Sequence, residues 1–136
     1  MDSNTKGCID TLLGPIERLP GNIALLRVQD NIQVDMEIAV NVINGLLRCF
    51  PGQKFFLIAD ARKILTMATM DALSFAAYHE QFNKYCKAQA IITDSLAISL
   101  IANFYALTLK KNVNVKLVKH MPEAEAWLKS KAELLD

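Results

Sequence analysis

The chain has 136 residues, of which 52% are hydrophobic, and this size and composition suit one globular domain with a core of its own. Fifteen basic and 14 acidic residues leave a formal net charge of +1, unlike the strongly basic domains that bind nucleic acids. No apolar run approaches the roughly 20 residues of a membrane span, and the polar first residues do not resemble a secretory signal. We therefore expect a single domain over 1–136 with a loose leader over 1–8, no nucleic-acid partner and no membrane insertion.

Three cysteines, Cys8, Cys49 and Cys86, are widely spaced, and no two of them form a C-x-x-C pair. The odd number and this spacing argue against a disulfide framework and against a zinc site. We therefore expect reduced thiols in a cytoplasmic protein, since disulfides are rare in that compartment. Cys49 and Cys86 are interpreted as buried structural thiols.

The N-terminal half of the chain predicts a hairpin, a helix and a buried strand. Two segments rich in apolar residues, 9–19 and 22–28, flank a Pro-Gly turn signal and predict an antiparallel hairpin. Apolar residues at helical spacing predict a helix over 35–48, which a second Pro-Gly pair terminates. The continuous apolar run at 54–59 is typical of a strand that is buried on both faces.

The C-terminal half alternates helices with short apolar strands. A loop over 61–68 precedes its first helix, for which Thr69 is the expected N-cap. The elements, in order, are a helix over 70–84, a strand over 88–92, a helix over 96–110, a strand over 113–118 and a helix over 123–134.

This order of elements, β-β-α-β-α-β-α-β-α, predicts an α/β domain. Alternating units after an opening hairpin form a mixed, mainly parallel sheet of about five strands with about four helices packed on it. We expect the sheet and its helices to make two or three layers.

Two stretches of the sequence resemble a known fold. They are FFLIADAR at 55–62 and AQAIITDSLAISLIANFYALTLKKNVNVKLVKHMPEAEAWL at 88–128. Together with the order of elements, they resemble the SpoIIAA-like fold of STAS domains and, more strongly, of a set of small uncharacterised bacterial proteins. The resemblance covers residues 20–134. It implies a SpoIIAA-like domain but no activity, because fold analogy alone does not establish function.

STAS antagonists carry a phosphorylatable serine in an Asp-Ser-Ser-Gly type of turn that begins the helix after the third strand. The matching segment here, 60–69, has no Asp-Ser pair and no glycine. Thr66 or Thr69 could take the phosphate, which would be favourable at a helix N-terminus. Each threonine is equally explained as a loop hydroxyl or a helix cap.

Polar side chains follow the predicted parallel strands, and we expect any ligand pocket or regulatory site at this edge of the sheet. Three structural explanations compete with this one: an Asp60–Arg62 ion pair, a helix cap at Asp94 and Ser95, and a turn at His120. The candidate residues at the edge are Asp60, Arg62, Thr66, Thr69, Asp94, Ser95 and His120.

The sequence contains no recognised phosphate-binding loop, metalloprotease motif or nucleophile elbow. His79 is interpreted as a solvated residue in the middle of a helix. A hydrolase or transferase using Asp60, Ser95 and His120 is the least supported hypothesis. We expect no catalytic residues, no metal and no cofactor.

The helix predicted over 96–110 is apolar almost all the way round, so it is either deeply packed or exposes a surface for a partner. The first functional hypothesis is a non-enzymatic regulatory or protein-interaction module of STAS-like type, which forms a homodimer or docks another protein. The alternative is a small-molecule or lipid-binding domain, by analogy with SEC14 lipid carriers. The candidate interaction surface consists of Ile98, Ile101, Phe104 and Tyr105.

Overall fold

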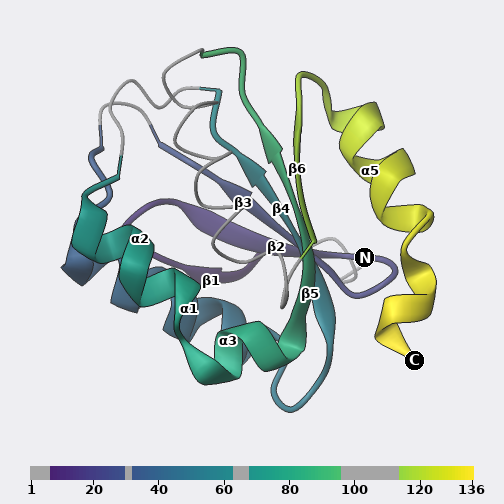
Figure 1. The fold of residues 1–136 in the computed structure, drawn as a ribbon, viewed down its shortest axis with the longest axis horizontal. Helices are drawn as coiled ribbons and strands as arrows, with labels where there is room; N and C mark the ends of the chain where they lie inside the picture. The colour runs from purple at the N-terminus through teal and green to yellow at the C-terminus, as the bar shows by residue number, and fades with distance from the viewer. Residues whose placement is uncertain (1–6, 30–31, 63–67, 96–113) are drawn as a thin grey trace.

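The computed structural model describes residues 7–29, 32–62, 68–95 and 114–136, and these form one six-stranded sheet with helices on both faces (Figure 1). The strands lie in the sheet in chain order. Strands β1 to β3 pair antiparallel, and β3 to β6 pair parallel. The strands are β1 (Gly7–Asp10), β2 (Pro15–Leu19), β3 (Ile23–Arg27), β4 (Phe55–Asp60), β5 (Cys86–Ile92) and β6 (Asn114–Val118).

The expected mixed α/β sheet is confirmed, with one strand more than predicted. The segment 9–19, predicted as a single strand, folds back on itself between β1 and β2. The backbone groups of Thr11 and Gly14 exchange two hydrogen bonds there, and the Thr11 hydroxyl donates a third to the Gly14 carbonyl at 2.6 Å. This local turn converts the predicted hairpin into a three-stranded antiparallel unit.

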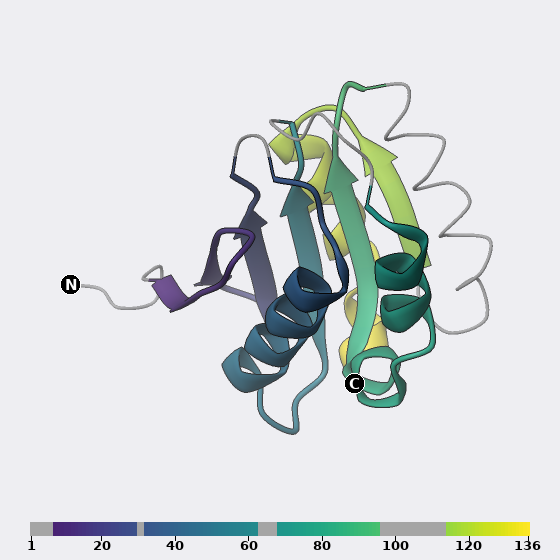
Figure 2. The same cartoon turned by 90° about the vertical axis from the view of Figure 1, so that its left-hand side faces the viewer.

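The helices α1 (Met36–Cys49), α2 (Met70–Ala77) and α3 (Glu80–Tyr85) cover one face of the sheet. Helix α5 (Met121–Lys129) and the short 3-10 segment η2 (Ala132–Leu135) cover the other face, so the domain has three layers (Figure 2). The Asp35 carboxylate accepts a hydrogen bond from the Ile38 N–H at 3.0 Å, which places the start of α1 where the sequence predicts it.

The single helix predicted over 70–84 is wrong, because the chain breaks between α2 and α3. His79 Nδ1 accepts a hydrogen bond from the Phe82 N–H at 3.1 Å and begins a new helix. The Asn83 side chain donates to the Ala77 carbonyl at 2.7 Å, which gives this carbonyl at the end of α2 a hydrogen-bond partner. His79 is therefore a helix cap and not a solvated mid-helix residue.

The last helix also differs from its prediction. It begins at Met121 and ends at Lys129, where the Ser130 hydroxyl donates to the Trp127 carbonyl at 2.5 Å. The helix predicted over 96–110 lies outside the described residues.

The core has two parts, one on each face of the sheet. Neighbouring residues of β3 and β4 alternate between the two parts, as the pleat requires. Phe55 and Leu57 pack toward α1, whereas Phe56 and Ile58 pack toward Ala124 and Leu128 of α5. These four apolar side chains of β4 are all buried, which confirms the strand predicted from the continuous apolar run.

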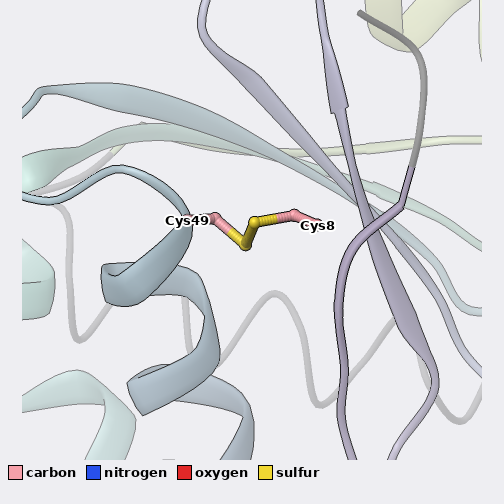
Figure 3. The surroundings of a disulfide bond; sticks show 2 residues. All are labelled: Cys8 and Cys49. Carbon is pink, nitrogen blue, oxygen red and sulfur yellow. A yellow bond between two sulfur atoms is a disulfide. The ribbon is translucent and has the colours of Figure 1, made fainter. Parts of the chain in front are cut away.

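The expectation of reduced cysteines is wrong for two of the three. Cys8 of β1 and Cys49 at the end of α1 form a disulfide that ties the first strand to the helix layer (Figure 3). The two residues are 41 positions apart, so their spacing gave no sign of the pairing. Cys86 is a free thiol, and its complete burial raises the pKa. Cysteine usage therefore no longer supports a cytoplasmic location.

No helix among the described residues is long and apolar enough to cross a membrane.

Candidate functional site

The edge at which the parallel strands end brings several predicted residues together. The register places Arg27, Asp60, Ile92 and Val118 in one row across β3 to β6. The residues that follow these strands therefore lie along the same edge.

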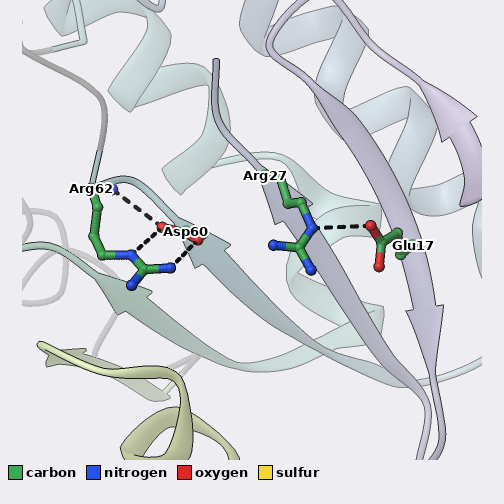
Figure 4. Close-up of polar contacts among 4 residues, drawn as sticks. All are labelled: Glu17, Arg27, Asp60 and Arg62. Carbon is green, nitrogen blue, oxygen red and sulfur yellow. Dashed lines mark hydrogen bonds and ion pairs between the residues drawn. The ribbon is translucent and has the colours of Figure 1, made fainter. Parts of the chain in front are cut away.

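Asp60 and Arg62 form a hydrogen-bonded ion pair at this edge (Figure 4). The guanidinium reaches both carboxylate oxygens, with Nε at 2.9 Å from Oδ1 and Nη2 at 2.7 Å from Oδ2, and the Arg62 N–H also donates to Oδ1 at 3.3 Å. The hydrogen bond from Arg62 lowers the pKa of Asp60 and outweighs the opposing effect of burial. This geometry keeps Asp60 ionised and limits its use as a general acid.

A second ion pair joins the neighbouring strands, with Arg27 Nε 3.0 Å from Glu17 Oε2 (Figure 4). Between the two pairs lies a hollow of about 230 Å³, lined by Arg27, Val28, Asp60 and Arg62. A hollow is therefore present at the edge where we expected a pocket. Each arginine that lines it is matched by a carboxylate.

Thr69 caps α2. Its hydroxyl oxygen accepts from the Ala72 N–H at 3.4 Å, and its O–H donates to Asp71 at 2.5 Å. The Thr69 backbone N–H donates to the Val34 carbonyl at 2.9 Å, which holds the starts of α1 and α2 side by side. Thr69 is thus a helix cap, which is the structural alternative to phosphorylation that the sequence offers. Thr66 lies outside the described residues.

The residues after β5 and β6 have local partners. The buried Thr93 hydroxyl accepts from the Ser95 N–H at 3.2 Å. The hydrogen bond to Asp60 raises the pKa of Arg62, and the charges of Asp60 and Asp94 raise it further. His120 occupies the N-cap position of α5, and its backbone N–H donates to the Glu123 carboxylate at 3.1 Å. The predicted interaction surface of Ile98, Ile101, Phe104 and Tyr105 lies outside the described residues.

The sequence did not mark two exposed methionines as candidate functional residues. Met36 and Met70, the first residues of α1 and α2, are 37% and 58% exposed. Since α1 and α2 follow β3 and β4, both methionines lie at the same edge as Arg62. Nothing in a helical apolar pattern distinguishes such exposed methionines from core residues.

An apolar pocket was also missed, and it lies between α1, α2 and the sheet. It measures about 200 Å³. In the part of the chain that the structure describes, Gln89 of β5 is its only polar lining residue, and Gln89 is 4% exposed. The sequence signal was a glutamine inside the buried strand AQAII. The apolar lining residues are Leu13, Val34, Ala39, Val42, Ile43, Leu46, Leu57, Ala68, Ala72, Leu73, Ala76 and Phe82.

Replacing Asp60 with asparagine is expected to lower the free energy of unfolding at about pH 7 by at most about 1 kcal/mol, because Arg62 is 46% exposed and solvent screens the pair. Folding lowers the pKa of Asp60, so its contribution is present above the unfolded pKa of about 3.9 and is lost as the pH falls through the folded value. Urea unfolding should therefore show a larger difference between wild type and Asp60→Asn at about pH 7 than at about pH 3. Glu17→Gln, which removes a charge from the adjacent pair, is the control, and an equal difference at both pH values would contradict the prediction.

Comparisons with known proteins agree with this architecture. The sequence profile of the family described as "Domain of unknown function (DUF7793)" matches residues 18–132. The chain belongs to this family. A search of curated proteins found no match.

Among solved structures, the chain is similar to an uncharacterised protein of the DUF3478 family with a SpoIIAA-like fold from Shewanella loihica PV-4. The TM-score is 0.61 with 15% sequence identity, over 83% of this chain and 90% of that one. The SpoIIAA-like fold implied by the sequence resemblance is therefore confirmed. At this identity, the similarity extends to the fold alone.

Proposed function

We propose that the domain is a non-enzymatic regulatory module that docks a protein partner at the edge where the parallel strands end. The observation that carries this proposal is the exposure of Met36 and Met70 on two adjacent helix starts. Methionine adapts to varied partner surfaces, and methionine and arginine are both enriched in protein interfaces. Arg62 lies at the same edge with nearly half of its side chain exposed.

The structural roles of four polar or reactive side chains support a non-enzymatic module. Asp60 is held by Arg62, Thr69 caps α2, and His79 caps α3. The Cys86 thiol is buried, and its raised pKa disfavours the nucleophilic thiolate. Acid–base and nucleophilic catalysis need groups that can reach a substrate and change their protonation, and these four are engaged or inaccessible.

The partner in this proposal is a second copy of the chain or another protein, and the proposed location is the cytoplasm. The partner is a protein because a regulatory module of STAS-like type acts through protein contacts. The cytoplasmic location is part of the same proposal. The paired charges around the hollow suit a polar rim around the two methionines, because interfaces commonly surround an apolar centre with polar groups.

The double substitution Met36→Ser/Met70→Ser is expected to reduce capture of the native partner by about tenfold, because it removes apolar contact area at the centre of the proposed interface. Tagged wild type and variant are expressed in the cells of origin, and captured proteins are quantified by mass spectrometry. Tyr78→Ser is the matched control, since Tyr78 is 76% exposed but lies at the opposite end of α2.

The control should retain the partner, and circular dichroism should show that all three proteins are folded. Equal capture by wild type and the double variant would rule out this edge as the docking surface. Loss of capture in the Tyr78→Ser protein would place the interface elsewhere.

A further inference from the structure

The pocket between α1, α2 and the sheet combines apolar walls with one buried polar group. Its volume is about 200 Å³, and among the described residues that line it only Gln89 carries a polar side chain. An apolar cavity of about 150 Å³ stays dry and accepts benzene. The pocket in this domain is therefore large enough for a molecule of on the order of eight to ten heavy atoms.

The Gln89 side chain points from the middle of the sheet toward this pocket. Ala88 and Ala90, its neighbours in β5, pack in the core on the α5 side. Because side chains alternate along a strand, Gln89 points to the opposite face, where α1 and α2 lie. The strands beside it contribute Leu57 and Val115 at the same level.

The Gln89 amide nitrogen has no hydrogen-bond partner within the described part of the chain, although it is fully shielded from solvent. A buried donor without an acceptor lowers the stability of a fold, and most buried polar groups are paired. An apolar residue of similar size would fill this position with a smaller loss of folding free energy. Such a group calls for an explanation, and Gln89 differs from the other unpaired buried atom of the described residues, Asn83 Oδ1, because Gln89 lines a cavity in which an acceptor could sit.

We propose that this pocket binds a small neutral molecule with an apolar body and a single hydrogen-bond acceptor, such as a carbonyl oxygen, which accepts from Gln89 Nε2. The ligand is neutral because none of the described residues that line the pocket is charged, and an unpaired buried charge is strongly unfavourable. The volume excludes the long acyl chain of a membrane lipid. Two lining residues, Val34 and Ala68, lie just before the starts of α1 and α2, but the proposal does not depend on the protein-docking role.

Acetophenone and isopropylbenzene are matched probes for this site. They have nearly the same shape, but only acetophenone offers a carbonyl acceptor. Each is titrated into the full chain and into Gln89→Met, which keeps the length of the side chain and removes the donor. Dissociation constants come from 1H–15N NMR shifts, and the side-chain amide signals of Gln89 report contact directly.

The ratio of the two affinities is expected to shift about tenfold toward isopropylbenzene in Gln89→Met. This variant should also melt about 3–6 °C higher, because it removes an unpaired buried donor. Gln81→Met on the exposed face of α3 is the matched control and should change neither quantity. Ala76→Leu should weaken the binding of both probes, because the added side chain occupies the pocket.

Three results would overturn the proposal. They are failure of wild type to bind either probe at millimolar concentration, an unchanged affinity ratio in Gln89→Met, and a lower melting temperature for that variant. The last result would mean that Gln89 stabilises the fold and does not wait for a ligand.

Discussion

Replacing Cys8 with serine is expected to lower the free energy of unfolding of the oxidised protein by about 2–4 kcal/mol. The disulfide closes a long loop, since Cys8 and Cys49 are 41 positions apart, and long loops gain the most from a cross-link in the chain-entropy account. Apart from Ile9, which packs against the core, strand β1 has few contacts of its own. Gly7, Cys8 and Asp10 are exposed, and β1 is an edge strand paired only with β2.

Urea unfolding of oxidised wild type, reduced wild type and Cys8→Ser measures this effect. The reduced wild type should match Cys8→Ser, and reductant should leave the variant unchanged, which controls for other actions of the reductant. Oxidised and reduced wild type with the same midpoint would contradict a stabilising bond.

The same cysteines bear on where the protein acts. Alkylation of Cys8 and Cys49 in intact cells reports whether the bond forms there. Free thiols would agree with the proposed cytoplasmic location, and a bond in all molecules would indicate an oxidising compartment.

Replacing Gly14 with alanine is expected to cost about 3 kcal/mol of stability. A Cβ atom at this position would lie 1.9 Å from the Arg27 carbonyl oxygen, and the residue has a positive φ of 155°. The obstacle is backbone, so a side-chain rotation cannot relieve it. The neighbouring Leu13 carbonyl accepts from the Gln29 N–H at 2.9 Å, and this contact would have to shift as well.

Gly7→Ala is the control for this substitution. A Cβ atom at Gly7 meets nothing within 4 Å, so the change should alter stability by less than about 0.5 kcal/mol. Thermal unfolding of both variants measures the difference. Equal stability of the two variants would show that the turn between β1 and β2 does not approach Arg27 as described.

Most of the parallel half of the fold could be predicted because its strands and helix starts have local signals. The continuous apolar run of β4 and the N-cap residues Asp35 and Thr69 mark their elements in the sequence itself. Two local errors arose where weaker signals compete. His79 is an uncommon N-cap, and a Gly-Pro pair inside 9–19 fits an interruption of one strand as well as it fits the end of a turn.

The candidate site was predicted only in part, because some of its features depend on contacts between distant segments. The position of Asp60 and Arg62 at the strand ends follows from parallel topology, which the sequence predicts. The Cys8–Cys49 bond and the exposure of Met36 and Met70 depend on how distant segments pack, which no local pattern records. Gln89 had a local signal, since a polar residue in a strand buried on both faces contradicts the pattern around it.

Native mass spectrometry of the protein purified from its own cells tests the docking role most directly. We predict a complex of defined mass, with a second 15.2 kDa copy or another protein, that is lost in Met36→Ser/Met70→Ser and retained in Tyr78→Ser. A monomer of that mass at every concentration, with no second chain in any preparation, would contradict the proposal that this domain acts by docking a partner.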